Sequence, residues 1–391
     1  MSFSPTRREA LQLATAVGML PALAACSGAP DDAAEQSPAT GLSALGEPTP
    51  VELAHATQFT LDAYDDGCRL VTMASGDRLL VVPEGVEPPE GLEGDIGVVR
   101  QPLANVYLVS TGMICLVDAI GALDVVSVSS VTAEDSPVDA FTERLEDGTI
   151  AYGGIYREPD YELIAATGCP LAIENTNIDH VPEVRAKLEE LGVTVLMEQS
   201  SREDDMLGRL EWIRVMGALF DRSDEAGEVF DDVAARVEAA SQEGPLGVSV
   251  AFFYINEDGA AVTRREGDYF CQMIEAAGGE YVSFAEEGAA DTSPTTITVE
   301  MERFYEGARD ADVIIYNGTI DDGVTSLEAL GEKNSLLADF KAVREGNASR
   351  ILPKWLTFNA DELTATVVAL PVREDIDFAL QENMIVEFYS R

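Results

Sequence analysis

Residues 204–240 form a long amphipathic pattern without proline, and no other feature constrains the fold of this chain as strongly. Apolar side chains recur there every three or four residues, as they do along one side of a helix. They are Leu210, Ile213, Met216, Leu219, Phe220, Val229, Phe230, Val233 and Val237. At about 1.5 Å per residue, a helix over this stretch would span on the order of 50 Å. We therefore expect one continuous helix that connects two separate lobes.

Both flanks of this stretch alternate between short apolar strands and helical patterns. On the N-terminal side, the strand-like segments Leu171–Ile173 and Thr194–Met197 enclose a helical pattern at residues 182–191. Strands joined by helices in this way predict a parallel sheet that is covered on both faces. The C-terminal side repeats the alternation, and its expected helices include residues 335–340, 360–368 and 376–386.

A chain of 391 residues exceeds what one compact core usually organises, so we expect two domains. The predicted fold class is α/β, with two Rossmann-like lobes that contain parallel sheets and enclose a ligand cleft. The expected N-terminal lobe spans residues 51–203, the connecting long α-helix residues 204–242, and the C-terminal lobe residues 243–391.

The N-terminus has the pattern of an export signal. The pair Arg7-Arg8 precedes a short apolar run that ends in Leu23-Ala24-Ala25-Cys26. This layout is typical of a secretory signal, and twin arginines indicate export of a folded protein. Leu-Ala-Ala-Cys resembles the lipobox of bacterial and archaeal lipoproteins, in which the cysteine carries the lipid. We expect a signal peptide over residues 1–25, lipidation of Cys26, a flexible tether over residues 26–50, and anchoring to the outer face of the cell membrane.

The chain carries 71 acidic and 25 basic side chains, which gives a formal net charge of −46. Such a field repels phosphate backbones, so we expect no nucleic-acid partner. We interpret the acidic residues as a solvated surface. Adaptation to high salt is the alternative, and composition does not separate the two.

The sequence favours neither a bound metal ion nor catalysis. His55 and His180 are the only histidines and lie far apart, which disfavours a site for bare zinc or manganese. Phosphate-binding loops, dinucleotide-binding fingerprints and nucleophile elbows are absent, so we predict no enzyme and no cofactor. Free buried thiols and disulfides both remain open for Cys68, Cys115, Cys169 and Cys271.

Candidate ligand-binding residues follow strands of both lobes, because ligands of parallel sheets bind at the carboxyl ends of the strands. In the first lobe they form three clusters: Tyr152, Tyr156 and Arg157; Glu174, Asn175 and Asn177; and Ser200, Ser201 and Arg202. Turn formation and helix capping are the alternative roles of each cluster. In the second lobe the candidates are Tyr254, Arg264, Arg265, Tyr269, Asn317 and Trp355. Near the start of the long helix, Arg209 or Trp212 is expected to face the ligand as well as the core.

An export signal, two α/β lobes and a connecting helix together resemble the substrate-binding proteins of ABC importers for cobalamin, ferric siderophores and haem. The similarity covers about residues 105–370 and is carried by the segments Ala119–Val126, Glu162–Ile173 and Phe270–Gly279. The segment 51–100 is extra; we expect short strands in it at residues 59–63, 69–73 and 78–82, separated by Asp/Gly and Ser/Gly turns. Cys169-Pro170 stands where that family usually has Pro-Asp.

The resemblance also implies how the protein meets its transporter. In that family one acidic residue on each lobe docks on arginines of the permease. These positions fall on Glu162 and on Glu300, with Glu302 as the alternative to Glu300. The implied partners are an ABC permease with its ATPase, a small metal chelate, and the membrane through the lipid anchor; we expect a monomer.

The class of ligand stays open at the level of sequence. Arginines and tyrosines suit an anionic ferric siderophore or haem propionates. An aromatic floor of Tyr152, Tyr156 and Trp355 would suit a corrin such as cobalamin. A surface lipoprotein that acts as a sensor or adhesin on the same scaffold is the alternative function.

Overall fold

The computed structural model describes residues 40–136, 138–242, 244–284, 295–317, 320, 324, 327–345, 356–359 and 364–367. The predicted signal peptide, Cys26, Trp355 and the expected helix at 376–386 lie outside these residues. Within them, no helix is both long enough and apolar enough to cross a membrane.

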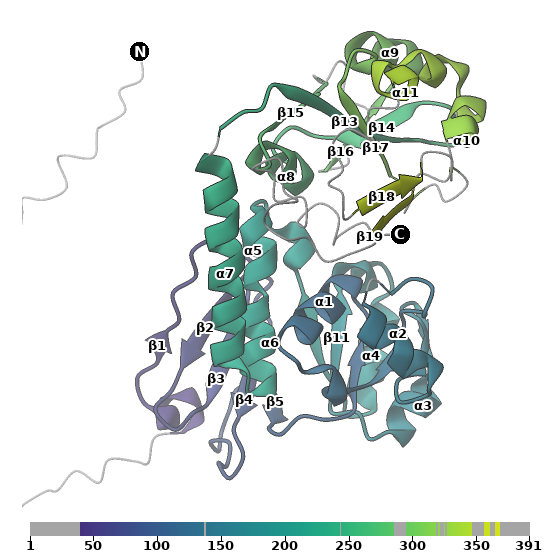
Figure 1. Ribbon diagram of the computed structural model, residues 1–391. Helices are drawn as coiled ribbons and strands as arrows, with labels where there is room; N and C mark the ends of the chain where they lie inside the picture. The colour runs from purple at the N-terminus through teal and green to yellow at the C-terminus, as the bar shows by residue number, and fades with distance from the viewer. Residues whose placement is uncertain are drawn as a thin grey trace, which may run out of the picture. The chain divides into compact units, whose positions relative to one another are not determined.

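The first sheet is built from the segment that is extra to the family resemblance. Its strands follow the chain order: β1 (Thr49–Pro50), β2 (Phe59–Ala63), β3 (Arg69–Met73), β4 (Arg78–Val82) and β5 (Ile96–Arg100) (Figure 1). The predicted strands at 59–63, 69–73 and 78–82 are thereby confirmed. The pairs are antiparallel except β4 with β5. Phe59, Val71 and Val81 point from this sheet into the same core as α6 and α7, described below.

The second sheet is fully parallel, as predicted. Its strand order is β12-β11-β6-β7-β8. The strands are β6 (Val106–Leu108), β7 (Val126–Ser129), β8 (Ala151–Tyr152), β11 (Leu171–Asn175) and β12 (Thr194–Glu198). Between them in the sequence lie α1 (Thr111–Ala119), α2 (Asp139–Glu146), the short strands β9 (Gly154–Ile155) and β10 (Glu158–Pro159), α3 (Tyr161–Ala166) and α4 (Pro182–Glu190). The order reverses between β6 and β11, which is the point where such sheets usually bind ligands.

Residues 204–242 form three helices, so the prediction of one continuous helix is wrong. They are α5 (Met206–Glu211), α6 (Ile213–Phe220) and α7 (Ser223–Gln242). Asp221 adopts a left-handed conformation with φ of 56° and ends α6, and Ser223 with two acidic neighbours begins α7. The apolar period continues across this turn because α6 and α7 both face the core formed with the first sheet.

Gly217 allows α6 and α7 to approach closely. A Cβ atom there would lie 2.7 Å from the Cβ of Ala226 and 2.9 Å from the carbonyl oxygen of Arg222. The connecting helix is therefore α7 alone, with 20 residues and a length of about 30 Å at 1.5 Å per residue.

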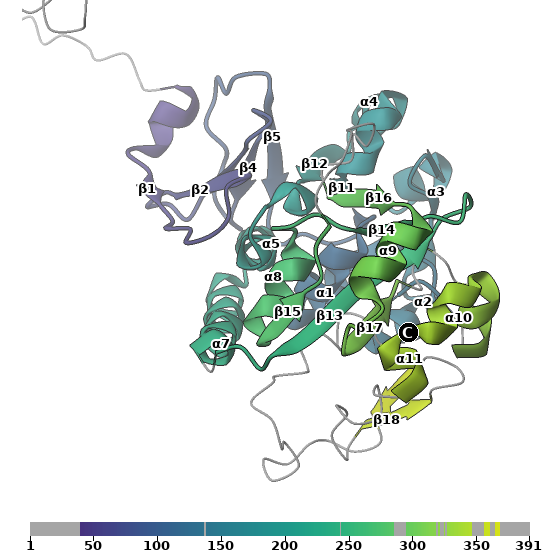
Figure 2. The same ribbon diagram turned by 90° about the horizontal axis from the view of Figure 1, so that it is seen from above.

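The third sheet is mixed. β13 (Val248–Ile255) pairs in parallel with β15 (Gly279–Tyr281) and β17 (Val313–Tyr316), so the prediction of a second parallel sheet is correct for these strands only. A hairpin adds the antiparallel β14 (Ala261–Arg264), which pairs with β16 (Thr296–Val299); the order can be followed in Figure 2. The helices of this part are α8 (Tyr269–Ala276), α9 (Met301–Ala308), α10 (Leu327–Lys333) and α11 (Lys341–Glu345).

Two of the C-terminal helix predictions need correction. Residues 335–339 form a short 3-10 helix, η5. The helix expected at 360–368 is wrong where the chain is described, because Thr364–Val367 forms strand β19, antiparallel to β18 (Leu356–Asn359). The β-branched residues Thr364, Thr366 and Val367 favour an extended backbone over a helix.

Two buried carboxylates attach the first sheet to α5. Glu211 accepts the backbone N–H groups of Ala54, His55 and Ala56 at 2.8–3.0 Å. Glu203 accepts those of Thr57 and Gln58, together with the Thr57 hydroxyl and the Trp212 indole N–H. Five consecutive N–H groups are thus satisfied by two side chains, which compensates for the burial of both charges. We call this arrangement the carboxylate clamp.

Candidate functional site

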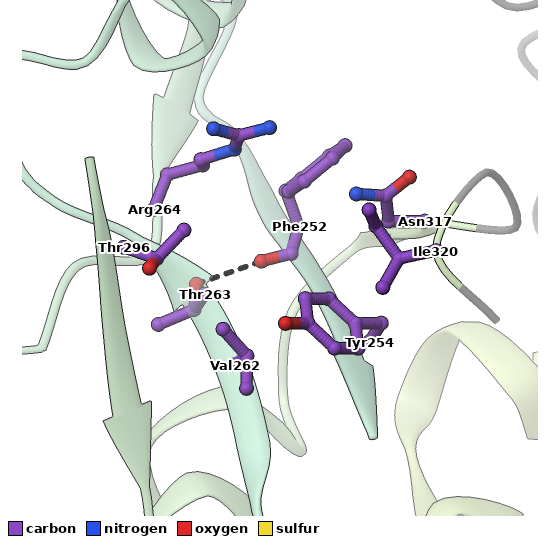
Figure 3. A pocket seen from close by; sticks show the side chains of 8 residues that line it. All are labelled: Phe252, Tyr254, Val262, Thr263, Arg264, Thr296, Asn317 and Ile320. Atoms are coloured by element: carbon purple, nitrogen blue, oxygen red, sulfur yellow. Dashed lines mark hydrogen bonds between the residues drawn. The ribbon is translucent and has the colours of Figure 1, made fainter. Parts of the chain in front are cut away.

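A pocket of about 160 Å³ lies on the third sheet, at the carboxyl ends of β13 and β17. It brings together three of the predicted ligand-binding residues: Tyr254, Arg264 and Asn317. Figure 3 shows that Arg264 and Asn317 enter from opposite sides, with Phe252 and Tyr254 between them. Val262, Thr263, Thr296 and the exposed Ile320 complete the lining. The pocket thus combines one guanidinium, one amide and an aromatic wall.

Arg264 is held by aromatic rings and by one carboxylate. Its guanidinium carbon lies 4.6 Å from the centroid of Phe270 and 5.5 Å from that of Phe252. The nearest carboxylate oxygen, on Asp268, is 3.8 Å from Nη1. Burial raises the pKa of the Asp268 carboxyl, which the Phe270 N–H and the two arginines Arg264 and Arg209 partly offset. These contacts fix the guanidinium without consuming its hydrogen-bond donors.

Arg209 connects α5 to the same group of residues. Its guanidinium carbon lies 3.9 Å above the ring of Tyr269, and its Nη2 donates to the carbonyl oxygen of Ser201 at 2.8 Å. The backbones of α5 and α8 are joined by Gln272, whose side chain accepts from the Met206 N–H and donates to the Asp204 carbonyl oxygen. Two of the predicted ligand-binding residues, Arg209 and Tyr269, are therefore in contact.

The three predicted clusters of the first lobe do follow strands of one parallel sheet and end at one edge. Thr176 Oγ1 and Ser201 Oγ lie 3.2 Å apart, and Arg202 Nη2 donates to Asp179 at 2.7 Å. These contacts join the short helices η3 (Thr176–His180) and η4 (Ser200–Arg202).

Within these clusters, Asn175 caps η3, because its Oδ1 accepts the Asn177 N–H. The N–H and the hydroxyl of Ser200 both donate to the Glu198 carboxylate, whereas the N-cap of η4, Gln199, makes no side-chain capping hydrogen bond. Tyr152 and Arg157 are exposed, whereas Tyr156 packs against the core of this sheet. Gly154, with φ of 80°, permits the tight hairpin that carries them, since a Cβ there would lie 2.6 Å from the Glu158 carbonyl oxygen.

Glu174 does not line an open site. It is 0% exposed, and neither carboxylate oxygen has a hydrogen-bond partner among the described residues. Burial raises the pKa of this carboxyl to about 8. Position in the sequence indicated the correct edge of the sheet but not the direction of the side chain, because alternate residues of a strand face opposite sides.

Of the other predicted site residues, some are buried in the core and others lie at the surface. Trp212 is fully buried and packs edge-on against Phe59 at 4.9 Å, so it faces the core only. Arg265 is half-buried and is not among the pocket-lining residues. Glu162 lies exposed in the first turn of α3; Glu300 and Glu302 lie exposed at the start of α9. Trp355 falls outside the described residues.

The described residues contain no group of three or more His, Cys, Asp or Glu side chains that could hold a metal ion. Cys68, Cys115, Cys169 and Cys271 are free thiols.

Five pocket-lining residues were not predicted from the sequence: Phe252, Val262, Thr263, Thr296 and Ile320. Phe252 could have been found, because it lies two residues before Tyr254 on the same strand and must share its face. Thr296 becomes a neighbour of Arg264 only through the antiparallel pairing of β14 with β16, which the sequence does not reveal.

Comparison with known proteins agrees with this architecture. An uncharacterised lipoprotein, MJ0878 of Methanocaldococcus jannaschii, is 25% identical over 319 residues, which cover 75% of this chain and 74% of the relative. The solved petrobactin-binding protein YclQ of Bacillus subtilis superposes with a TM-score of 0.50 at 14% identity, over 77% of this chain and 88% of that one.

A separate local similarity links 63 residues to small ribosomal subunit protein uS4 of Acetivibrio thermocellus at 46% identity. It covers 16% of this chain and only 30% of the ribosomal protein. A net charge of −46 opposes binding to RNA, so this short match carries no functional argument.

The periplasmic binding protein family matches residues 108–352, which is more than half of the 391-residue chain. The matched range begins at the last residue of β6 and includes the other strands of the second sheet, α7 and all strands of the third sheet, β13 to β17. It excludes the first sheet, as expected for a segment that is extra to the family. The chain therefore belongs to the periplasmic binding protein family.

Proposed function

We propose that the protein is the lipid-anchored solute receptor of an ABC importer, and that it captures an anionic metal chelate and delivers it to the permease. The observation that carries this proposal is Arg264 in the aromatic pocket of the third sheet. A chain with a net charge of −46 repels anions as a whole, so a site for an anion must supply positive charge locally. A planar guanidinium also suits bidentate contact with a carboxylate.

Other observations support the same function. Arg209, Tyr269 and Arg264 form a continuous cationic and aromatic group beside the pocket. The relative MJ0878 is described as a lipoprotein, which agrees with the proposed lipid on Cys26. Family membership supports a binding protein without catalytic activity. Ferric siderophores and haem fit these residues better than cobalamin, because a corrin offers less for the arginine to bind.

A thermal-shift screen of the mature protein against ferric siderophores, haem and cobalamin tests the proposal. A true ligand at 100 times its Kd should stabilise the protein by about 2.7 kcal/mol. We expect Arg264→Gln to weaken binding of an anionic chelate about tenfold to a hundredfold, since a hydrogen bond to a charged group contributes roughly 1.5–3 kcal/mol.

The matched control is Arg309→Gln, an exposed arginine of the same lobe that pairs with Asp310. It should leave the affinity unchanged. Binding of only a protein or a glycan, with no response to any chelate, would favour the sensor or adhesin instead.

Docking on the permease gives a second expected result. We expect Glu162→Arg to reduce ligand uptake by whole cells at least tenfold while the affinity of the isolated protein stays the same. The reason is that an exposed charge at a rim sets orientation and encounter rate rather than ligand binding. Glu183→Arg, an equally exposed change on α4, is the control and should transport normally. Equal uptake by both variants would remove Glu162 from the docking surface.

A further inference from the structure

Glu174 is a buried acid whose carboxyl has no hydrogen-bond partner among the described residues. Its side chain faces the same side of the second sheet as Ala172 and Tyr107, because Ala172 pairs with Tyr107 and Glu174 follows two residues later. That face is apolar and is covered by Ile164 of α3, Val184 and Leu188 of α4, and Ile178 of η3. An unsatisfied carboxyl in such surroundings is costly, so its presence calls for a functional explanation.

The groups around Glu174 include no compensating positive charge among the described residues. Burial, and after it the charge of Glu174, raises the pKa of the Tyr107 hydroxyl on β6 and of the Tyr161 hydroxyl on α3. On β12, Met197 is its neighbour, and Glu198 faces the opposite side and binds Ser200. Cys169 lies in the same apolar cluster. On α3, η3 and α4, Glu162, His180 and Glu183 are exposed, Asp179 is paired with Arg202, Arg185 with Asp77 and Glu189, and Lys187 with Glu190. Burial therefore favours the neutral form of the Glu174 carboxyl.

The position of Glu174 links its charge to the edge of the sheet. It is the penultimate residue of β11, next to the reversal of strand order between β6 and β11. The next residue, Asn175, caps η3, and η3 is held by Ile178 in the apolar cluster and by the Asp179–Arg202 pair. A displacement of Glu174 toward solvent would pull on this short segment before any other.

We propose that Glu174 is a proton-dependent positioning residue for the segment Asn175–His180. With a proton on its carboxyl, Glu174 stays buried and the segment stays closed. When the proton is lost, the carboxylate moves toward solvent and the segment opens. If the proposed function holds, Asn175 and Asn177 then leave the ligand, and affinity falls in alkaline solution.

Hydrogen exchange of the ligand-free mature protein tests this directly and does not depend on any ligand. Amide protection of residues 175–180 is measured from pH 6 to pH 9, with intrinsic exchange rates removed. We expect protection in the wild-type protein to fall roughly tenfold per pH unit up to about pH 8 and then to level, because opening releases one proton. In Glu174→Gln, which keeps the shape without the titration, protection should not change with pH.

The controls separate a switch from a merely buried acid. Glu162→Gln, an exposed change in the same part of the chain, should retain the wild-type pH dependence. If Glu174→Gln does not fold, Glu174→Met, which fills the apolar site, takes its place in the same measurement. An identical slope with and without the carboxyl would overturn the proposal. So would protection of residues 175–180 as high as that of residues 223–242 of α7, since the segment would then exchange only through global unfolding. Neither result would bear on chelate binding, which the thermal-shift screen tests separately.

Discussion

Glu211→Ala is expected to lower the free energy of unfolding by about 4 kcal/mol, a cost typical of breaking a buried charged network. The carboxylate is 0% exposed and satisfies the N–H groups of Ala54, His55 and Ala56. Alanine would leave these three donors without a partner, and each unsatisfied buried group costs about 1–3 kcal/mol unless water enters. Urea unfolding followed by circular dichroism measures the difference.

Two further variants show whether the clamp itself is responsible. Glu211→Gln keeps a carbonyl oxygen as acceptor, so it should cost about half as much. Glu238→Ala removes an exposed glutamate of α7 and should change stability by less than about 0.5 kcal/mol. A loss below about 1 kcal/mol for Glu211→Ala would mean that the segment 54–58 does not depend on the carboxylate.

Glu174→Gln is expected to have an effect on stability that grows with pH. In the wild-type protein the pKa of this carboxyl is about 8 in the folded state, against about 4.5 for a free side chain. Below pH 4.5 the carboxyl is protonated in both the folded and the unfolded protein, so burial of its charge does not lower stability there. From there to pH 8 only the unfolded state loses its proton, and each unit lowers the stability of the wild type by about 1.4 kcal/mol. At pH 8 the accumulated loss is on the order of 4–5 kcal/mol.

The measurement is the difference in unfolding free energy between wild type and Glu174→Gln at several pH values. Other titrating groups, such as Asp312 with a pKa near 2 beside Lys341, are shared by both proteins and cancel. The unfolding free energy of Glu174→Gln relative to that of the wild type should rise steadily from pH 5 to pH 8. Above pH 8 the difference should stay constant. A difference that is constant over this range would mean that Glu174 is ionised in the folded state or solvated on folding.

Some elements of the fold are determined by residues that are close together in the sequence, and others are not. β2, β3 and β4 occur at the predicted residues, because alternating apolar side chains between Asp/Gly and Ser/Gly turns determine a strand without help from distant residues. The prediction of one helix over residues 204–242 was wrong because a single residue overrode the local pattern. The apolar period continued across Asp221, where one left-handed residue sufficed to end α6 and reverse the chain.

Some residues of the candidate site could likewise be predicted from the sequence, but their grouping in one pocket could not. Arg264, Tyr254 and Asn317 could be named from the sequence because they follow or end strands of an alternating α/β pattern. Their grouping with Phe252 depends on the hairpin of β13 and β14. Their grouping with Thr296 depends on the pairing of β14 with β16, which places Thr296 opposite Arg264, more than thirty positions away in the sequence.

The sequence by itself determined the α/β class, the parallel second sheet, the family and the export signal that we predict, since these depend on periodicity and on short motifs. Only the tertiary structure decided which of the charged side chains are buried and what surrounds them. Only the fold buries Glu203 and Glu211 against the N–H groups of residues 54–58. Only the fold buries Glu174 where no described residue offers it a hydrogen bond. All three are glutamates in a chain rich in them. The free energy of a carboxylate is set by the dipoles and the water that surround it, and those are known only once distant segments have packed together.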